Sequence, residues 1–476
     1  MKRSIHTAFL VIFCGMLAYG GWLYWRIFAE SGFSKQMKWV GHAPSGITNA
    51  YELEFTRTLS AQRHPLITGL ADLKWNALDV SFIRKVEKGR EGWLFLKEEV
   101  AGRNELLQSL GIRPYLDFER KMWKLIISQR AAWTNARGMQ YVMVVVPNKT
   151  SIYPEYLPAR DRVVGPGNLT QLLSDLSGIQ VINLTDSLLS QKHIGRLFHK
   201  NETHWNELGA FVAYQSLMRA LPPPFRETPL PLDSVVVEWA TTPGGDLARL
   251  LLMDSLLFER AARVTLRNPQ ARCHTGCDSS YGPFMPPKHF RNPRARLSKV
   301  FFDHDSFFRP LIPYLAEHFQ ESVFYWEWQG FNDYEIGQAQ PGLVIDEFVE
   351  RSLIGDRPRN NPPVLQHYWQ QHFDALPQLA RLSCKSLRQA FLQIELIQVK
   401  EDALPVVALE LTPASATRLI VEYDDKEVVY PLEAGKKNTV YLEWERPRMK
   451  DLRVEGGTGM TITVRAAVFF LQFPHR

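Results

Sequence analysis

The sequence lacks the short motifs that most often signal a bound cofactor or metal. Its 476 residues contain no P-loop, no Gly-rich dinucleotide fingerprint and no Cys-x-x-Cys pair. Nothing therefore supports a nucleotide-binding, nicotinamide-dependent or zinc-ribbon protein. Internal repeats and low-complexity tracts are also absent from the sequence. We expect a globular protein of ordinary composition that uses neither a cofactor nor a metal.

Cysteine is scarce, with four residues in the whole chain. Cys14 lies in an apolar run, Cys384 stands alone, and Cys273 and Cys277 form the stretch "CHTGC". A disulfide between Cys273 and Cys277 is one interpretation, because an exported domain can keep such bonds. A metal site that includes His274 is the other, and it needs a fourth ligand that the sequence does not offer.

A strong charge of one sign is missing as well. The chain has 56 Lys and Arg against 50 Asp and Glu, a formal net charge of +6. This mild excess suits an acidic polymer or an anionic membrane surface, and we expect no nucleic-acid partner. Apolar residues make up 45% and charged residues 22% of the chain, as in globular proteins. At this length, two or three domains are expected.

Only one apolar run is long enough to cross a membrane. Residues 7–25 carry no charge, and Lys2 and Arg3 precede them. These 19 residues at about 1.5 Å each nearly span a hydrocarbon core. The basic end stays in the cytoplasm. We therefore expect residues 1–30 to be a membrane anchor and the rest of the chain to lie outside the cytoplasm. A cleaved signal peptide is the competing interpretation, and residues 31–84 form a linker.

The pattern after this linker predicts an α/β domain over residues 85–385. Apolar residues at helical spacing predict a helix over residues 116–137. The β-branched run of residues 140–147 follows, as in a strand buried on both faces. A second helix and strand occupy residues 169–184. Such alternation is typical of a parallel sheet flanked by helices.

Two later regions have a different character. Residues 222–297 are rich in Pro and Gly, and we expect loops and short elements there. From about residue 390, short β-rich runs alternate with turns at spacings of about ten residues. This spacing predicts an antiparallel β-sandwich over residues 386–476. The sandwich either binds carbohydrate or is purely structural.

A serine at a strand–turn–helix junction is a candidate nucleophile. Ser306 follows the apolar strand residues 300–302 and precedes an amphipathic stretch. A serine there lies at the carboxyl edge of the sheet, where α/β proteins bind ligands. Backbone amides near Phe307 would then stabilise an oxyanion. The alternative is that Asp305 or Ser306 simply caps the helix.

A serine nucleophile needs a base, and the stretch "HKNETHWNELGA" (199–210) offers one. His204 has a carboxylate, Glu202, two residues away. On an extended backbone, residues i and i+2 share a side, so Glu202 can orient the His204 imidazole. The alternative is a His beside a helix start that Asn206 caps.

Together these stretches resemble the alginate O-acetyltransferase family. Six segments match its motifs in order: "GREGWLFL" (89–96), "VVVPNKTSIYPEYLP" (144–158), "HKNETHWNELGA" (199–210), "GGDLARLL" (244–251), "FFDHDSFFRPLIPYLAEHF" (301–319) and "PGLVIDEFVERSL" (341–353). The base precedes the nucleophile, as in that family. Two positions depart from its pattern, because Glu202 stands where Asp is usual and His304 where Gly is common.

The resemblance implies an SGNH-hydrolase-like fold and an acyl-transfer reaction. Ser306 would carry the acetyl group, His204 would act as the base and Glu202 as its orienting acid. Lys149, Asn332 and Tyr334 are candidates for the substrate pocket. Glu350 and Arg351 are expected to pair.

The resemblance also implies where the protein works. The acceptor would be an exopolysaccharide in the periplasm. A multispanning membrane O-acyltransferase would supply the acetyl group at the inner membrane. A polysaccharide acetyl esterase and a non-catalytic, membrane-tethered binding or scaffold protein remain the alternatives.

Overall fold

The structure is a computed structural model. It describes residues 84–98, 104–159, 161, 163–277, 286–326, 330–353, 360–395, 403–423, 427–444, 449–455 and 460–470. The chain divides into two units, Met1–Leu73 and Lys74–Arg476, and all described residues lie in the second. The expected anchor and all but the last residue of the expected linker fall outside the described residues. Within those ranges, no helix has both the length and the apolar character needed to cross a bilayer.

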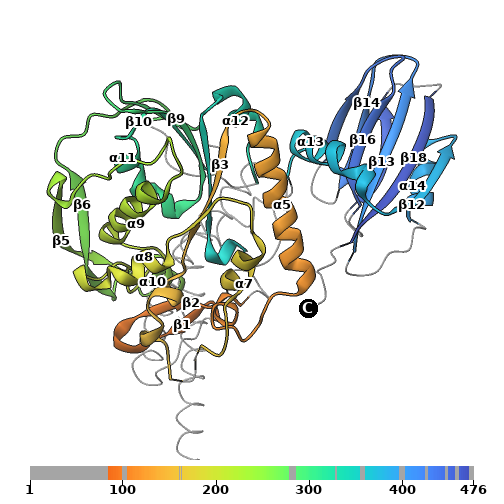
Figure 1. The fold of residues 1–476 in the computed structure, drawn as a ribbon. Coiled ribbons are helices and arrows are strands. Elements are labelled where there is room, and N and C mark those ends of the chain that lie inside the picture. Colours follow the sequence, from red (N-terminus) through yellow and green to blue (C-terminus); the bar gives the residue numbers. More distant parts are fainter. Residues whose placement is uncertain are drawn as a thin grey trace, which may run out of the picture. The chain divides into compact units, whose positions relative to one another are not determined.

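A seven-stranded mixed sheet forms the centre of the larger domain (Figure 1). Its order is β4 (Val181–Asn183), β3 (Gln140–Val146), β11 (Leu343–Val349), β9 (Leu297–His304), β10 (Phe319–Trp326), β8 (Lys288–Arg291) and β7 (Arg272–Thr275). The first five strands are parallel, which confirms the predicted α/β sheet. The last two are antiparallel, since β8 pairs in this way with β10 and β7 with β8.

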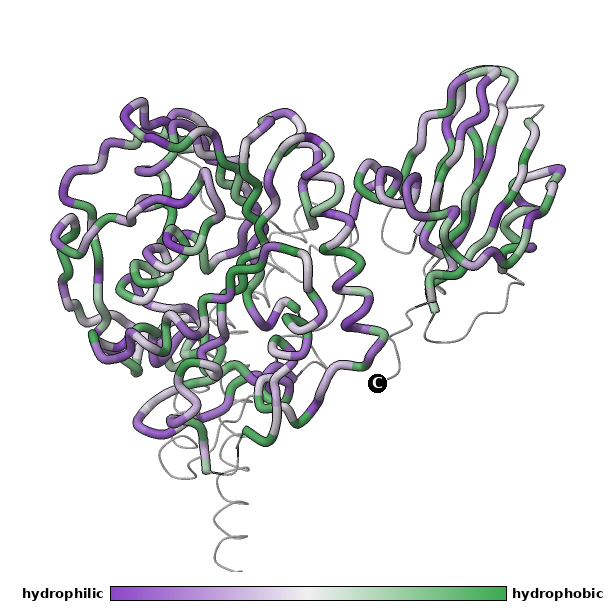
Figure 2. The backbone as a smooth tube through the Cα atoms, viewed as in Figure 1, coloured by the Kyte–Doolittle hydropathy of each residue, from purple (hydrophilic) through white to green (hydrophobic). Residues whose placement is uncertain are grey.

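Helices cover both faces of this sheet. The even-numbered residues from Val142 to Val146 join the core cluster that contains α9 (Glu207–Ala220). The odd-numbered residues from Tyr141 to Val145 join the cluster that contains α5 (Asp117–Asn135). The residues along the central strands are accordingly mostly hydrophobic, as Figure 2 shows. Burial on both sides explains why β3 is a continuous apolar run rather than an alternating one.

The remaining elements of this domain are short. They are β1 (Val86–Lys88), β2 (Leu94–Leu96), α4 (Glu105–Ser109), α6 (Lys149–Ile152), α7 (Asn168–Asp175), α8 (Thr185–Ser190), α10 (Asp246–Leu250), α11 (Ile312–Leu315) and α12 (Asp333–Ala339), with the 3-10 turns η6 (Ser306–Leu311) and η7 (Glu350–Leu353). The expectation of loops over residues 222–297 is wrong in one part. There β5 (Val235–Pro243) and β6 (Phe258–Leu266) pair as a long antiparallel hairpin. Most of its exposed positions carry polar residues or proline, and Trp239 and Phe258 are the exposed aromatics, so the strands lack a clear apolar face in the sequence.

The C-terminal region contains two antiparallel sheets with a common hydrophobic core. One sheet has the order β12 (Gln378–Cys384), β18 (Met460–Phe470), β13 (Ala403–Pro413) and β16 (Asn438–Glu443). The other has the order β15 (Glu427–Leu432), β14 (Thr417–Tyr423) and β17 (Met449–Glu455). β12 pairs with β18, so the boundary expected at residue 385 falls after a strand that already belongs to this region. Two helices, α13 (Pro362–His372) and α14 (Leu387–Glu395), lie before and after β12 in the chain.

The paired cysteines are bonded to each other. Cys273 and Cys277 form a disulfide whose Cα atoms lie 5.7 Å apart. The disulfide interpretation is therefore confirmed, and the competing metal site would lack its two thiolate ligands. Cys384 is free and buried.

His304, at the end of β9, is accommodated by burial in an aromatic pocket. Its side chain is 0% exposed, and the rings of Phe308, Phe324 and Trp326 lie about it at centroid distances of 5.9, 6.2 and 6.2 Å. Its Nδ1 lies 2.7 Å from the Asp305 carbonyl oxygen. Burial lowers the pKa of His304 to about 4. The ring is therefore neutral at pH 7, and its Nδ1–H donates to that carbonyl.

We expect His304 to make stability depend on pH. An unfolded His has a pKa near 6.5, above the folded value, so protons bind the unfolded chain preferentially as the pH falls from about 6.5 to about 4. Between these limits the wild type should lose about 3 kcal/mol more unfolding free energy than His304→Gln. Urea unfolding at several pH values measures this, with the exposed His193→Gln as control. Equal pH slopes in the wild type and His304→Gln would contradict the expectation.

Candidate active site

Ser306 begins η6 directly after the turn that ends β9. The Asp305 carboxylate accepts a hydrogen bond from the Phe307 amide at 2.7 Å, which caps the turn. The Asp305 amide donates in turn to Glu347 Oε2 on β11, at 2.8 Å. Capping therefore falls to Asp305, and Ser306 is left for other contacts. The Phe307 amide already has an acceptor, so the structure does not favour it as the expected oxyanion donor.

His204 lies in a tight loop that is closed by backbone hydrogen bonds. The His199 amide donates to the His204 carbonyl oxygen at 3.2 Å, and the Asn206 amide to the Leu197 carbonyl oxygen at 2.9 Å. The Asn206 side chain accepts from the Gly209 amide and caps α9, as the sequence predicts. A Cβ on Gly209 would lie 2.1 Å from the Leu197 carbonyl oxygen. Only glycine therefore allows the helix to start this close to the loop.

The structure brings the three residues of the expected triad together. His204 Nε2 lies 2.7 Å from Ser306 Oγ, although 102 residues separate them in the chain. His204 Nδ1 lies 3.1 Å from Glu202 Oε1. The side chains of His204 and Glu202 are 22% and 30% exposed, so solvent reaches the site.

A tryptophan links the segment of the base to that of the serine. Trp205 Nε1–H donates to the Phe307 carbonyl oxygen at 3.0 Å. The Trp205 ring meets the Phe307 ring edge-on at 5.3 Å, and the His204 ring lies 4.5 Å from the same ring. The neighbours of the two reacting groups are thus packed together.

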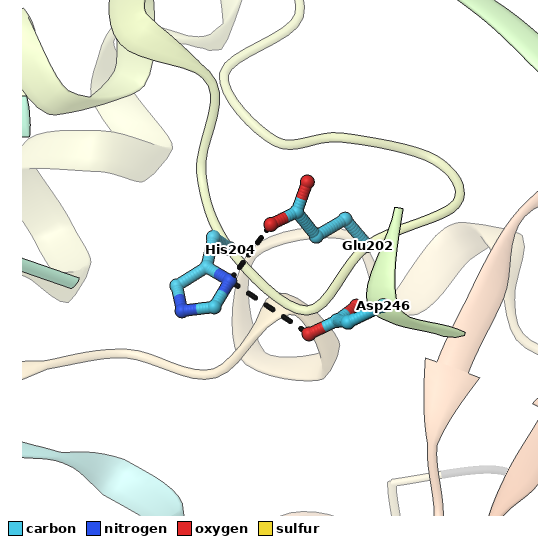
Figure 3. A group of neighbouring side chains, drawn as sticks. All are labelled: Glu202, His204 and Asp246. Atoms are coloured by element: carbon cyan, nitrogen blue, oxygen red, sulfur yellow. Dashed lines mark hydrogen bonds and ion pairs between the residues drawn. The ribbon is translucent and has the colours of Figure 1, made fainter. Parts of the chain in front are cut away.

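A second carboxylate, from Asp246, approaches His204. Its Oδ2 lies 3.8 Å from His204 Nδ1, on the same ring nitrogen that faces Glu202 (Figure 3). The Thr203 amide donates to Asp246 Oδ1 at 2.7 Å, and the Thr203 hydroxyl donates to Oδ2. Sequence reasoning missed this residue, although the segment "GGDLARLL" was among the matching motifs.

Gly245 makes room for the long side chain of Glu202. A Cβ on Gly245 would lie 2.5 Å from Glu202 Cβ and 2.7 Å from its Oε2. Any larger residue would push this carboxylate away from His204. The usual Asp is one methylene shorter, so the space beside Gly245 is what accommodates the longer acid.

Glu202 is ionised at neutral pH. Burial alone would raise the pKa of Glu202, but the hydrogen bond with His204 and the charges of His204, His199 and Arg249 hold it below its usual value. An ionised Glu202 can keep a proton on His204 Nδ1 and leave Nε2 free to accept one from Ser306.

The same residues also form a metal-like group. Among the described residues, Glu202, His204 and Asp246 are the one set of His, Cys, Asp or Glu whose donor atoms lie within 4.8 Å of one another. Both nitrogens of His204 already have hydrogen-bond partners. These contacts are the ones that proton transfer by His204 would require.

Lys149 is buried and lines a small pocket together with Thr203 and Arg351. It is 4% exposed, and its ammonium donates to the carbonyl oxygens of His199, Lys200 and Glu202 at 3.1, 3.0 and 2.6 Å. Burial lowers the pKa of Lys149 to about 7, against the opposing effect of nearby carboxylates. The contacts of the Lys149 ammonium are thus with the loop that carries His204, and its expected role in substrate binding stays a prediction.

Within the part of the chain that the structure describes, no hydrogen bond or ring contact joins Asn332 or Tyr334 to the triad. Asn332 caps α12, where its side chain accepts from the Glu335 amide at 3.0 Å. Tyr334 is 69% exposed on the same helix.

The expected pair of Glu350 and Arg351 is also wrong. Glu350 accepts from the Asn148 amide and the Ser151 hydroxyl at 2.8 and 2.6 Å. The Arg351 guanidinium lies 5.0 Å from the centre of the Phe307 ring.

Comparison with known proteins shows what the region that contains Glu202, His204 and Asp246 is similar to. Residues 86–280 match the model of the SGNH-hydrolase-like domain of the acetyltransferase AlgX. The chain is 27% identical over 281 residues to the probable alginate O-acetylase AlgJ of Pseudomonas aeruginosa, and 28% identical over 274 residues to that of Pseudomonas syringae. These matches cover 55% and 54% of this chain, and 64% and 63% of the two relatives.

Two solved structures are similar at a lower level. The O-acetyltransferase domain of Pseudomonas putida AlgJ is 21% identical with a TM-score of 0.39, and the match covers 60% of this chain and 99% of that one. Bacillus cereus PatB1 with a sulfonyl adduct is 17% identical with a TM-score of 0.44, and the match covers 58% and 98%. The sequence matches confirm the resemblance to the alginate O-acetyltransferase family, and within this chain residues 86–280 resemble the SGNH-hydrolase-like domain of AlgX.

Proposed function

We propose that this protein is an O-acetyltransferase that moves an acetyl group through Ser306 onto hydroxyls of an exopolysaccharide. The observation that carries the proposal is the 2.7 Å contact between His204 Nε2 and Ser306 Oγ, with the Glu202 carboxylate on the other ring nitrogen. A serine becomes nucleophilic only beside such a base. The sequence similarity to alginate O-acetylases supports the acetyl group and the sugar acceptor.

The reaction then has two steps, acetylation of Ser306 and transfer of the acetyl group to the sugar. His204 Nε2 takes the Ser306 proton while Oγ attacks the acetyl carbonyl carbon, and the departing donor oxygen or sulfur receives that proton. The acetyl group is left on Ser306 as an ester. A sugar hydroxyl next gives its proton to His204 and attacks the ester carbon. Ser306 recovers the proton as the acetylated sugar leaves.

The surroundings of the enzyme belong to the same proposal. The apolar run of residues 7–25 and the basic residues before it support an inner-membrane anchor with the catalytic domain in the periplasm. Acetyl-CoA is not available there, so a multispanning membrane O-acyltransferase would pass acetyl groups across. The C-terminal sheets are candidates for holding the polymer. The matches span 64% and 63% of the two AlgJ relatives.

Transfer and hydrolysis are separated by the acceptor. With p-nitrophenyl acetate and an oligosaccharide such as oligomannuronate, we expect the wild type to form acetylated sugar and Ser306→Ala to form none. Free acetate without acetylated sugar would instead indicate an esterase. Mass spectrometry of the sugar measures the outcome.

A non-catalytic scaffold makes a different prediction at Ser306. A sulfonyl fluoride should label the wild type at this serine, and His204→Ala should slow the labelling at least tenfold because the base is gone. A wild type that is not labelled would favour the scaffold.

The two carboxylates on His204 Nδ1 should have unequal roles. Because Glu202 is the nearer, Glu202→Gln should lower kcat by about 100-fold or more. Asp246→Asn should cost about tenfold, since an amide oxygen still accepts from Thr203. The kcat of the double variant should be lower than that of Glu202→Gln if Asp246 supports the residual activity. A larger loss in Asp246→Asn than in Glu202→Gln would make Asp246 the orienting acid.

Gly245 provides a steric test of Glu202. In Gly245→Ala the new methyl group overlaps Glu202, so we expect kcat to drop at least tenfold with little change in KM. Gly337→Ala is the matched control, because a Cβ there meets nothing within 4 Å and alanine favours the helix. Full activity in Gly245→Ala would contradict the role given to this space.

A further inference from the structure

Lys149 lies beneath the loop that carries the base. It is the first residue of α6, directly after β3 and its short connection. Its Nζ is within 3.1 Å of three carbonyl oxygens, those of His199, Lys200 and Glu202. All three belong to the six residues that lead to His204. The buried ammonium therefore contacts the backbone of the loop, while the Lys149 side chain also lines a small pocket with Thr203 and Arg351.

The number of donors matches the number of acceptors. A protonated lysine has three N–H groups and no acceptor, and three carbonyl oxygens converge on it. A neutral amine would turn a lone pair toward one of these oxygens, so all three contacts need the protonated form, which predominates below the lowered pKa of about 7. The rings of Phe95 and Trp93 lie 5.4 and 5.7 Å from the ammonium and favour its charge. With every N–H in use, none is left to bind a substrate.

An anion holds the amides of the same loop. The Glu259 carboxylate of β6 accepts from the Lys200 amide at 2.8 Å and from the Asn201 amide at 3.3 Å. Arg196 and His199 pair with the same carboxylate at 2.8 and 3.2 Å. The loop thus turns its carbonyls to a buried cation and its amides to a buried anion. Its conformation is set by these charges rather than by a helix or strand.

We propose that Lys149 is a positioning residue that fixes the backbone of residues 199–202 and so keeps His204 within hydrogen-bonding distance of Ser306. The expected effect of Lys149 on kcat rests on the proposed function, whereas its expected effect on the loop does not. Lys149 contacts neither Ser306 nor the His204 ring. It acts through the loop, so its loss should move the base without removing any reacting group.

Hydrogen–deuterium exchange of the full-length protein tests the structural half directly. The amides of His199, Lys200, Asn201 and Thr203 all have acceptors in the loop or beside it. In Lys149→Met, which keeps the length but no donor, exchange in this segment should rise at least tenfold, while β3 and α9 stay protected. Unchanged exchange in the segment would overturn the proposal, whatever the activity of the enzyme.

The kinetic half uses p-nitrophenyl acetate. Lys149→Met should lower kcat at least tenfold and leave KM within about twofold, because the base moves and the pocket does not. A raised KM with unchanged kcat would overturn the proposal in favour of substrate binding by Lys149. Loosened exchange with an unchanged kcat would overturn it too.

Lys288→Met is the matched control. This lysine is also buried, and it donates to the carbonyl oxygens of Gly276 and Cys277 in another part of the chain. Its loss should leave both kcat and the exchange of residues 199–203 unchanged. An equal effect in Lys288→Met would overturn the proposal by showing a general loss of stability.

Two further variants make the outcomes separable. If Lys149→Met does not fold, Lys149→Gln is the substitute, because its amide can still donate to some of the three loop carbonyls. The kcat of Lys149→Gln should lie between the wild-type value and complete loss. Ser306→Ala tests the proposed function by itself. Full activity in Ser306→Ala would refute the serine mechanism, and the exchange data would still decide whether Lys149 holds the loop.

Discussion

The geometry of the site depends on the hydrogen bond from Trp205 Nε1–H to the Phe307 carbonyl oxygen. It joins the residue after the base to the residue after the serine, so the two reacting groups are brought together by their neighbours. A bond between the reacting groups themselves could not do this, because it must break in each half of the reaction. The aromatic contacts of Phe307 with Trp205 and His204 pack the same junction. The 2.7 Å approach of His204 to Ser306 follows from this packing.

Much of the fold could be predicted from the sequence because its signals are local. The run of residues 140–146 indicates a doubly buried strand, and the turn after residue 304 places Ser306 at the edge of the sheet. Glu202 was found for the same reason, because two residues of spacing suffice to bring it to His204. The hairpin of β5 and β6 was missed, since its exposed polar face reads as a loop.

Other parts of the site could not be predicted because they depend on tertiary contacts. Asp246 reaches His204 from the connection between β5 and β6, and no spacing along the chain indicates this. Lys149 looked like a cation for a substrate, but its acceptors are backbone carbonyls, which carry no signature in the sequence. The space beside Gly245 is visible only when the position of Glu202 is known.

These contacts explain how a loop can hold a catalytic base. A loop has no internal ladder of hydrogen bonds, so its buried amides and carbonyls need partners from elsewhere. Lys149 at the end of β3 supplies donors, and Glu259 on β6 supplies acceptors. Each charge is costly to bury, and each is offset by the backbone dipoles and by opposite charges nearby. Two buried charges thus hold the loop to the elements around it. The loop, which has no regular structure of its own, can then keep the His204 ring in a fixed position.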